Sequence, residues 1–153
     1  MTPATPTPVP APPVSDTAAA WHRMLLLHAR VESHLATALQ RGHGIGLSEY
    51  RALGHLTTSA NGELRMQELA DKVGLNQSSV TRLVARLHAA DFAYRDLCPD
   101  DKRGVYTVVT ETGRVKFAEA SRTYEETLSA ALAEAGQADP GLAAALTALG
   151  ALR

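Results

Sequence analysis

The sequence predicts a mainly helical protein with one small β-hairpin, and three observations predict it. Hydrophobic residues make up 45% of the chain but aromatic residues only 5%, which favours packed helices over a β-sandwich. Over most of the chain apolar side chains recur at steps of three and four, the period of an amphipathic helix. Between residues 92 and 110 the period changes to two, as in β-strands. The length of 153 residues suits one compact domain together with helices that pair it with a partner.

Charge and cysteine content exclude several classes of protein. Fifteen basic and sixteen acidic residues give a net charge of -1, so the overall charge gives no argument for nucleic-acid binding. The single cysteine, Cys98, cannot form an intramolecular disulfide, and there is no signal-peptide pattern and no run of 18 apolar residues. We therefore expect a reduced, cytoplasmic protein that does not enter a membrane.

The first 15 residues form a proline-rich tail. The tail holds six of the eight prolines in the chain, and such a composition buries too little apolar surface to offset the entropy of ordering. We expect residues 1–15 to be disordered, with a polyproline II recognition segment as the alternative.

A long amphipathic helix follows the tail. From Asp16, which we expect to cap the helix, the chain continues to Arg41 without proline or glycine. A second stripe on a neighbouring face indicates that the helix contacts two surfaces, and a dimer partner is one candidate for the second. This stripe consists of Trp21, Leu25, His28, Glu32 and Leu39. The main stripe consists of Ala20, Met24, Leu27, Val31, Leu35 and Ala38.

A second helix follows a loop that contains three glycines. The loop, residues 41–46, is not preceded by a strand or followed by GKS or GKT, so it does not predict a phosphate site. Ser48 is expected to cap the helix, and Asn61-Gly62 predicts the turn that ends it. The helical spacing is kept by Leu47, Tyr50, Leu53 and Leu56.

Residues 66–85, MQELADKVGLNQSSVTRLVA, have the features of a helix-turn-helix. This unit needs two short helices at a fixed angle, with a small residue where they meet and a tight turn between them. Ala70 allows the close approach, Gly74 permits a positive φ at the turn, and Asn76 can cap the second helix. The stripe of the second helix that must face the core is Val80, Leu83, Val84 and Leu87.

The opposite face of that second helix is polar and suits the DNA major groove. The positive end of the helix dipole attracts phosphate, small hydroxyl side chains permit a close approach, and Arg82 can reach guanine. An ordinary solvated helix is the alternative. The residues that we predict to bind DNA from this helix are Gln77, Ser78, Ser79, Thr81, Arg82 and Arg86.

A β-hairpin is predicted directly after the helix-turn-helix. Residues 92–97 and 105–110 read as two strands, and the connection CPDDKRG contains turn-forming proline and glycine. Lys102 and Arg103 lie at the hairpin tip and Arg95 lies in the first strand, where a wing could meet backbone phosphates or enter the minor groove.

The chain ends in two further helices. The first begins at Glu111, and Pro140 starts a short helix that continues to Arg153. Their apolar faces, together with that of the first helix, are most simply buried by a second copy of the chain, which predicts a homodimer. The apolar face of the longer helix consists of Phe117, Ser121, Tyr124, Leu128, Ala131 and Ala135.

Three segments, LSEYRALGHL, LRMQELADKVGLNQSSVTRLVARL and PDDKRGVYTVVTETGR, resemble the MarR family of multiple antibiotic resistance regulators. The resemblance extends over roughly residues 17–153. It implies a winged helix-turn-helix transcription regulator, a repressor, that binds double-stranded DNA as a homodimer. Two winged units would straddle successive major grooves of a palindromic operator, with half-sites about 34 Å apart.

The resemblance also implies roles for individual residues. Asp101-Lys102-Arg103 matches the wing-tip pattern D-x-R, in which the arginine enters the minor groove and the aspartate orients it. Arg86 is expected to support the wing through an acidic partner. Asp91 stands where the family commonly has glycine. Asp can adopt the left-handed conformation at such a position, but less easily than glycine does. The family's redox cysteine lies in the first helix, so Cys98 is interpreted as an incidental thiol.

These elements divide the chain into four predicted parts. They are a disordered tail at 1–15, a dimerisation helix and loop at 16–46, a winged helix-turn-helix domain at 47–112 and C-terminal dimerisation helices at 113–153.

A small-molecule effector is implied by the resemblance as well. Family members bind aromatic or phenolic acids between the dimer helices and the winged domain, and the ligand changes the separation of the recognition helices. The candidate pocket residues, which combine aromatic surface with groups that can pair a carboxylate, are Trp21, His22, His28, Arg51 and His55.

Two other kinds of regulator and an enzyme are the alternatives. His28 and Glu32 lie four residues apart on one helix face, as in a metal-responsive regulator, but no third ligand is evident. A winged-helix adaptor that binds only protein is the other possibility. The sequence has no G-x-S-x-G, H-E-x-x-H or Walker motif, so we expect no catalysis, no metal and no cofactor.

Overall fold

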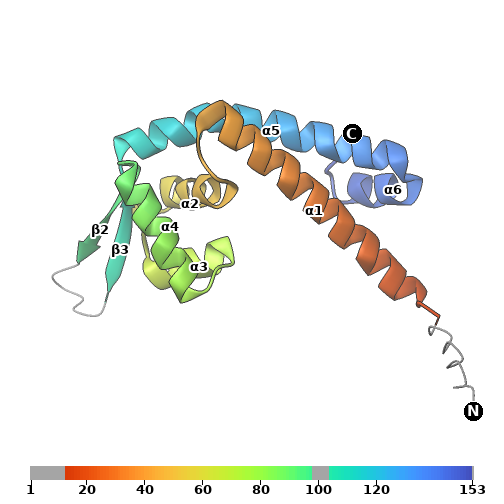
Figure 1. Ribbon diagram of the computed structural model, residues 1–153, viewed down its shortest axis with the longest axis horizontal. Helices are drawn as coiled ribbons and strands as arrows, with labels where there is room; N and C mark the ends of the chain where they lie inside the picture. Colours follow the sequence, from red (N-terminus) through yellow and green to blue (C-terminus); the bar gives the residue numbers. More distant parts are fainter. Residues whose placement is uncertain (1–12, 98–103, 153) are drawn as a thin grey trace, which may run out of the picture.

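The computed structural model describes residues 13–97 and 104–152. The compact unit in Figure 1 contains α2, α3, α4 and a small sheet; α1 and α5 extend from it, and α6 packs beside the end of α5. The prediction of a mainly helical fold with a small β-hairpin is confirmed. In chain order the elements are α1 (Asp16–His43), α2 (Leu47–Thr58), η1 (Ala60–Gly62), β1 (Glu63–Arg65), α3 (Met66–Val73), α4 (Gln77–Ala89), β2 (Ala93–Leu97), β3 (Val105–Val109), α5 (Glu111–Ala138) and α6 (Pro140–Ala148).

Two helix caps differ from the predicted ones. Ser15 caps α1, since its hydroxyl accepts a hydrogen bond from the Ala18 N–H at 3.2 Å, and Asp16 lies in the first turn instead. At α2, Gly46 holds the cap position and the Glu49 carboxylate accepts its N–H at 2.8 Å, so Ser48 is not the cap. A glutamate three residues into a helix reaches back to the cap amide, and its charge also complements the helix dipole.

The helix-turn-helix is built as the sequence predicts. Gly74 ends α3 with a φ of 74°, in the left-handed region that glycine adopts without steric cost. The Asn76 side chain caps α4 by accepting the Ser79 N–H at 2.9 Å. Asp91, after α4, has a φ of 60°, and its carbonyl accepts the Thr110 hydroxyl at 2.6 Å. Asp91 thus adopts the left-handed conformation, at the position where the family commonly has glycine.

The sheet has three antiparallel strands rather than the two of the predicted hairpin. The strand order is β1-β3-β2, with Leu64 opposite Thr107 and Arg95 opposite the same Thr107 on the other side. The sequence did not reveal β1, because three residues are too few to show an alternating pattern. The extra strand joins the start of α3 to the wing.

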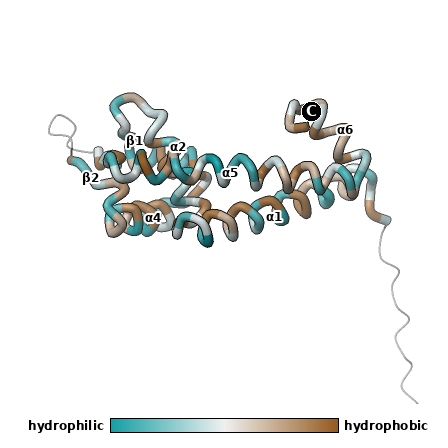
Figure 2. The backbone as a smooth tube through the Cα atoms, turned by 90° about the horizontal axis from the view of Figure 1, so that it is seen from above, coloured by the Kyte–Doolittle hydropathy of each residue, from teal (hydrophilic) through white to brown (hydrophobic). Residues whose placement is uncertain are grey.

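Two hydrophobic clusters meet at α2. Seen from above, α1 runs alongside α5 (Figure 2). The cluster between them includes Leu35, Leu39 and Tyr50. The ring of Tyr50 stacks on that of Tyr124, with the ring centroids 4.5 Å apart. Phe117 packs against both clusters. The other cluster fills the winged unit with Leu53, Leu56, Leu69, Val80, Leu83, Val84 and Leu87. Because α2 contributes to both clusters, its position links the long helices to the helix-turn-helix.

Several predictions concern residues whose surroundings the structure does not describe. The wing-tip residues Asp101, Lys102 and Arg103 lie outside the described residues, as do Cys98 and most of the tail at 1–15. Within the described ranges, no helix is long and apolar enough to cross a membrane.

Candidate nucleic-acid interface

The two faces of α4 are clearly distinguished by burial. The core stripe of Val80, Leu83, Val84 and Leu87 is at most 1% exposed. On the opposite face Gln77, Ser78 and Arg82 are exposed, whereas Ser79 and Thr81 are half-buried. The polar face of the second helix therefore points away from the core of this chain.

Hydrogen bonds within α4 arrange its outward side chains. The Ser78 hydroxyl donates to the Asn76 side-chain oxygen at 3.0 Å, and the Thr81 hydroxyl donates to the Gln77 carbonyl at 2.8 Å. Arg82 Nη2 lies 3.4 Å from the Ser79 hydroxyl, to which it donates. The guanidinium of Arg82 is thus held over the first turn of the helix, where the positive dipole end and an arginine combine to attract an anion.

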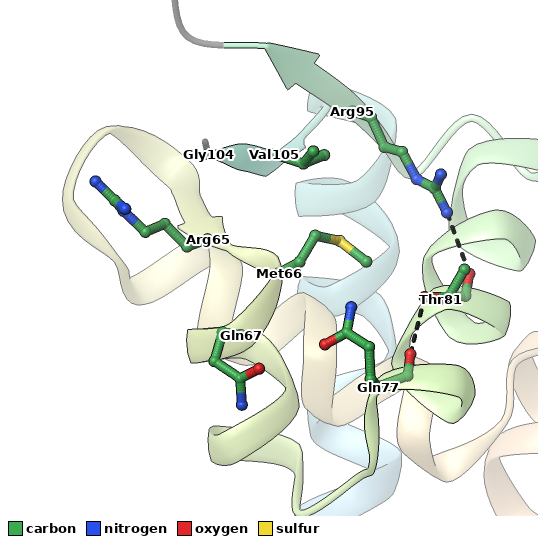
Figure 3. Close-up of a pocket in the computed structure, with 8 residues that line it drawn as sticks. All are labelled: Arg65, Met66, Gln67, Gln77, Thr81, Arg95, Gly104 and Val105. Atoms are coloured by element: carbon green, nitrogen blue, oxygen red, sulfur yellow. Dashed lines mark hydrogen bonds between the residues drawn. The ribbon is translucent and has the colours of Figure 1, made fainter. Parts of the chain in front are cut away.

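A cavity of about 380 Å³ separates α4 from the hairpin. Arg95 reaches from β2 to α4, where its Nη2 donates to the Thr81 carbonyl at 3.4 Å (Figure 3). At the rim, Arg65 Cζ lies 5.4 Å from the centre of the Tyr106 ring. The remaining lining residues are Met66, Gln67, Gln77, Gly104 and Val105. Sequence reasoning missed Arg65, the last residue of β1, and Gln67, on α3, because the cavity that they line forms only when these elements pack beside α4 and the hairpin.

Arg86 has an acidic partner, but that partner is not in the described part of the wing. Arg86 Nε donates to Glu49 Oε1 at 2.8 Å, so the arginine ties α4 to the start of α2. Support of the wing by Arg86 stays a prediction. Glu49 was not among the predicted site residues, since its 37-residue separation from Arg86 leaves no signal in the sequence.

The candidate pocket residues divide between two helices. Arg51, on α2, donates to both carboxylate oxygens of Glu32 on α1, at 2.5 and 3.0 Å, and His28 Nε2 lies 3.7 Å from the same carboxylate. His55 is half-buried on α2, and Trp21 is exposed on α1. The structure therefore brings His28 and Arg51 to one carboxylate.

His22 occupies a different place from the other candidates. It lines a cavity with Val14, Asp16, Ala19 and Arg23, and none of the other four candidates lines that cavity. In the described ranges, no group of three or more His, Cys, Asp or Glu side chains could hold a metal ion.

The Glu32–Arg51 pair has a direct electrostatic consequence. The hydrogen bonds from Arg51 lower the pKa of Glu32 below its ordinary value of 4.5, against the opposing effect of partial burial. The same hydrogen bonds raise the pKa of Arg51. A carboxylate whose pKa is lower in the folded chain stabilises the fold above its unfolded pKa, and this stabilisation is lost as the pH falls through the folded value.

Glu32→Gln is expected to lower the free energy of unfolding by about 1 kcal/mol at pH 7, a modest figure because both partners are partly exposed. The difference from the unaltered chain should shrink as the pH falls from 4.5 through the lowered pKa of folded Glu32, where the carboxylate becomes protonated. Urea unfolding between pH 7 and pH 3, at fixed protein concentration, measures it. Glu126→Gln is the control, since its partner Arg122 is a solvent-exposed neighbour on the same helix. If the difference in the free energy of unfolding between Glu32→Gln and the unaltered chain stays constant over this pH range, the ion pair between Glu32 and Arg51 is not its cause.

Comparisons with known proteins agree with this geometry. A protein-family model for the MarR family matches residues 43–104. The structure of Sco3205 from Streptomyces coelicolor, a MarR family transcriptional regulator in complex with DNA, is 26% identical, and the match covers 92% of this chain and 91% of that one with a TM-score of 0.75. The winged unit of this chain is thus similar to the MarR family. Members of the MarR family are transcription regulators rather than enzymes, as the sequence predicts for this chain.

Two further structures show the same MarR fold at lower identity. AbsC, a MarR family transcriptional regulator from S. coelicolor, is 23% identical, with 92% of this chain and 96% of AbsC covered and a TM-score of 0.74. BpsR of Bordetella bronchiseptica, whose DNA binding is regulated by 6-hydroxynicotinic acid, is 17% identical, with 90% and 94% covered and a TM-score of 0.72. No curated protein sequence matches the chain.

Proposed function

We propose that this chain is a MarR-type homodimeric repressor that binds a palindromic operator with α4 in the major groove and the hairpin at the adjacent minor groove. The observation that carries the proposal is the division of α4 into a fully buried apolar stripe and an outward polar face. The base-reading residues would be Gln77, Ser78, Ser79, Thr81 and Arg82, and the wing would add Arg95, Asp101, Lys102 and Arg103.

The chemistry of the outward face supports DNA rather than protein as the partner. Arg82 can donate two hydrogen bonds to guanine, and the short side chains of Ser78 and Thr81 allow the helix to lie close to the base edges. The solved complex of Sco3205 with DNA supports DNA as the partner of this chain as well, since the two chains are similar.

Exposed apolar side chains on α1 support the homodimer. Trp21, Met24 and Leu26 are 60%, 53% and 57% exposed in the single chain. Large apolar side chains gathered on one helix mark an interaction surface, and symmetric pairing of two copies is the commonest way of covering it. A two-fold dimer would present two copies of α4 to half-sites about 34 Å apart.

An aromatic or phenolic acid is the proposed effector. The regulation of BpsR by 6-hydroxynicotinic acid supports this class of ligand. Trp21, His22, His28, Arg51 and His55 remain the candidate contacts, and Arg51, which already donates to Glu32, would have to share its guanidinium with a ligand carboxylate or leave Glu32. Such a ligand would release DNA by favouring a conformation with a different spacing of the two recognition helices.

Arg82→Ala is expected to weaken binding to the chain's own upstream intergenic DNA about tenfold or more, because a bidentate contact to guanine is lost. Fluorescence anisotropy with a salt titration measures the loss, and Arg122→Ala, on an exposed part of α5, is the control that should bind normally. The salt dependence reports how many phosphates the protein neutralises.

Three results would oppose the proposal. Binding that ignores Arg82→Ala favours a protein-binding adaptor. A molar mass in solution equal to that of one chain contradicts the homodimer. Stoichiometric metal in the purified protein, with DNA binding that depends on it, favours the metal-responsive alternative.

A further inference from the structure

The Glu49 carboxylate serves two elements at once. Its Oε2 accepts the Gly46 N–H at 2.8 Å and so caps α2, while its Oε1 accepts Arg86 Nε at 2.8 Å. The Glu49 side chain is only 18% exposed. Both oxygens are therefore engaged within the chain, and Glu49 is a fixed anchor rather than a mobile surface group.

Arg86 uses one side of its guanidinium for this contact and presents the other to solvent. Its side chain is 55% exposed, and the described residues provide no hydrogen bond to its Nη1 or Nη2. Along α4, Arg86 follows Ser78 and Arg82 at steps of four residues, which places the three side chains along one side of the helix. The free edge of Arg86 thus lies on the proposed DNA-binding side.

The length of α4 determines what Arg86 can reach. Arg86 lies nine residues after Gln77, about 13.5 Å along the helix axis, and the major groove is about 12 Å wide. When the first turn of α4 meets the base edges, Arg86 lies near the edge of the groove, where the phosphates are. A guanidinium with two adjacent free N–H groups matches the paired oxygens of a phosphate.

We propose that Arg86 binds a backbone phosphate of the operator and that Glu49 is the positioning residue that holds it there. This inference rests on the proposed function, since it requires α4 to lie in the major groove. Glu49 acts by accepting a hydrogen bond from Nε, which fixes the plane of the guanidinium so that Nη1 and Nη2 face the phosphate. Because the Arg86 side chain is already ordered, binding does not cost the entropy of ordering it. Arg86 then contributes affinity for every sequence rather than selectivity for one.

A double-mutant cycle on DNA affinity tests the proposal. The two substitutions are Glu49→Gln and Arg86→Gln. Glutamine at position 49 can still accept the Gly46 N–H and keep the helix cap, but its amide group would face Arg86 Nε as a donor, so only the hold on the arginine is lost. Affinity is measured by anisotropy on a duplex from the upstream intergenic DNA and on a duplex of scrambled sequence, each over a range of salt concentrations.

Arg86→Gln is expected to weaken binding to both duplexes about tenfold and to reduce the slope of log affinity against log salt by about 0.9, the value for one phosphate. Glu49→Gln is expected to weaken binding about threefold in the unaltered chain and not at all in the Arg86→Gln background. In an Arg82→Ala background, the matched control, the effect of Glu49→Gln should persist, because Arg82 does not contact Glu49. Arg86→Lys should restore only part of the affinity, since one ammonium group cannot serve Glu49 and a phosphate in the same geometry.

Three outcomes would overturn the inference. An unchanged salt slope in Arg86→Gln excludes a phosphate contact, and a loss confined to the intergenic duplex indicates base reading instead. An equal effect of Glu49→Gln with and without Arg86 shows that Glu49 acts through the fold. In each of these cases the unaltered chain still binds DNA, whereas failure of the unaltered chain to bind any duplex would overturn the proposed function itself.

Discussion

Gly113→Ala is expected to lower the free energy of unfolding by about 3 kcal/mol, at the upper end for an overpacked site. Gly113 is buried in the first turn of α5, where its N–H donates to the Thr110 hydroxyl. A Cβ at this position would lie 2.1 Å from the Phe92 carbonyl oxygen and 3.0 Å from a Val109 methyl carbon. Because the closest atom belongs to the backbone, relief requires α5 to move away from Phe92, which directly precedes β2. Urea unfolding at fixed protein concentration measures the loss.

Gly42→Ala provides the matched control for this substitution. Gly42 also lies in a helix, near the end of α1, but nothing lies within 4 Å of a Cβ placed there. Alanine should raise stability by up to about 1 kcal/mol, because it lowers the entropy lost when the helix forms. Equal stability of the two variants would show that α5 does not pack on Phe92 as described.

Leu83→Ala is expected to cost about 3 kcal/mol of folding free energy, as is usual when a fully buried leucine is truncated and leaves a cavity. Leu83 is 0% exposed and lies in the cluster that fills the winged unit. The preceding residue, Arg82, is exposed, so Arg82→Ala should leave stability almost unchanged while weakening DNA binding. Thermal unfolding and DNA anisotropy on both variants separate the two effects.

This pair of neighbours tests the orientation on which the proposed function depends. A large loss of stability in Arg82→Ala, together with tolerance of Leu83→Ala, would mean that α4 is rotated and that its polar side faces the core. The same measurement would then remove the basis for a DNA-reading face.

Much of the winged unit was predictable because its signals are local. Gly74, Asn76 and the buried stripe of α4 lie within a few residues of the features that they determine, and the structure shows each of them as predicted. The third strand was missed, because β1 has only three residues and is defined by pairing with β3, more than 40 positions later. Arg65, at the end of β1, was missed for the same reason, and Gln67, on α3, was missed because the cavity that both residues line forms only in the folded chain.

The charged pairs were predicted less well than the apolar stripes. Arg86 was expected to support the wing through an acidic partner; the acidic group that it contacts is Glu49 on α2, and its support of the wing stays a prediction. Arg51 was predicted as a ligand contact, and the structure shows its guanidinium engaged by Glu32. Its role toward an effector stays a prediction.

The sequence by itself determined where α3 ends and α4 begins, which side of α4 is apolar and which family the chain resembles. These properties depend on backbone preferences and on hydrophobic periodicity, both of which are set by residues that are close together in the sequence. Only the tertiary structure decided that Glu32 meets Arg51 across 19 positions and that Glu49 meets Arg86 across 37. Any of several acidic residues could have satisfied each arginine, and the packing of α2 between α1 and α4 selects which of them comes within hydrogen-bond distance.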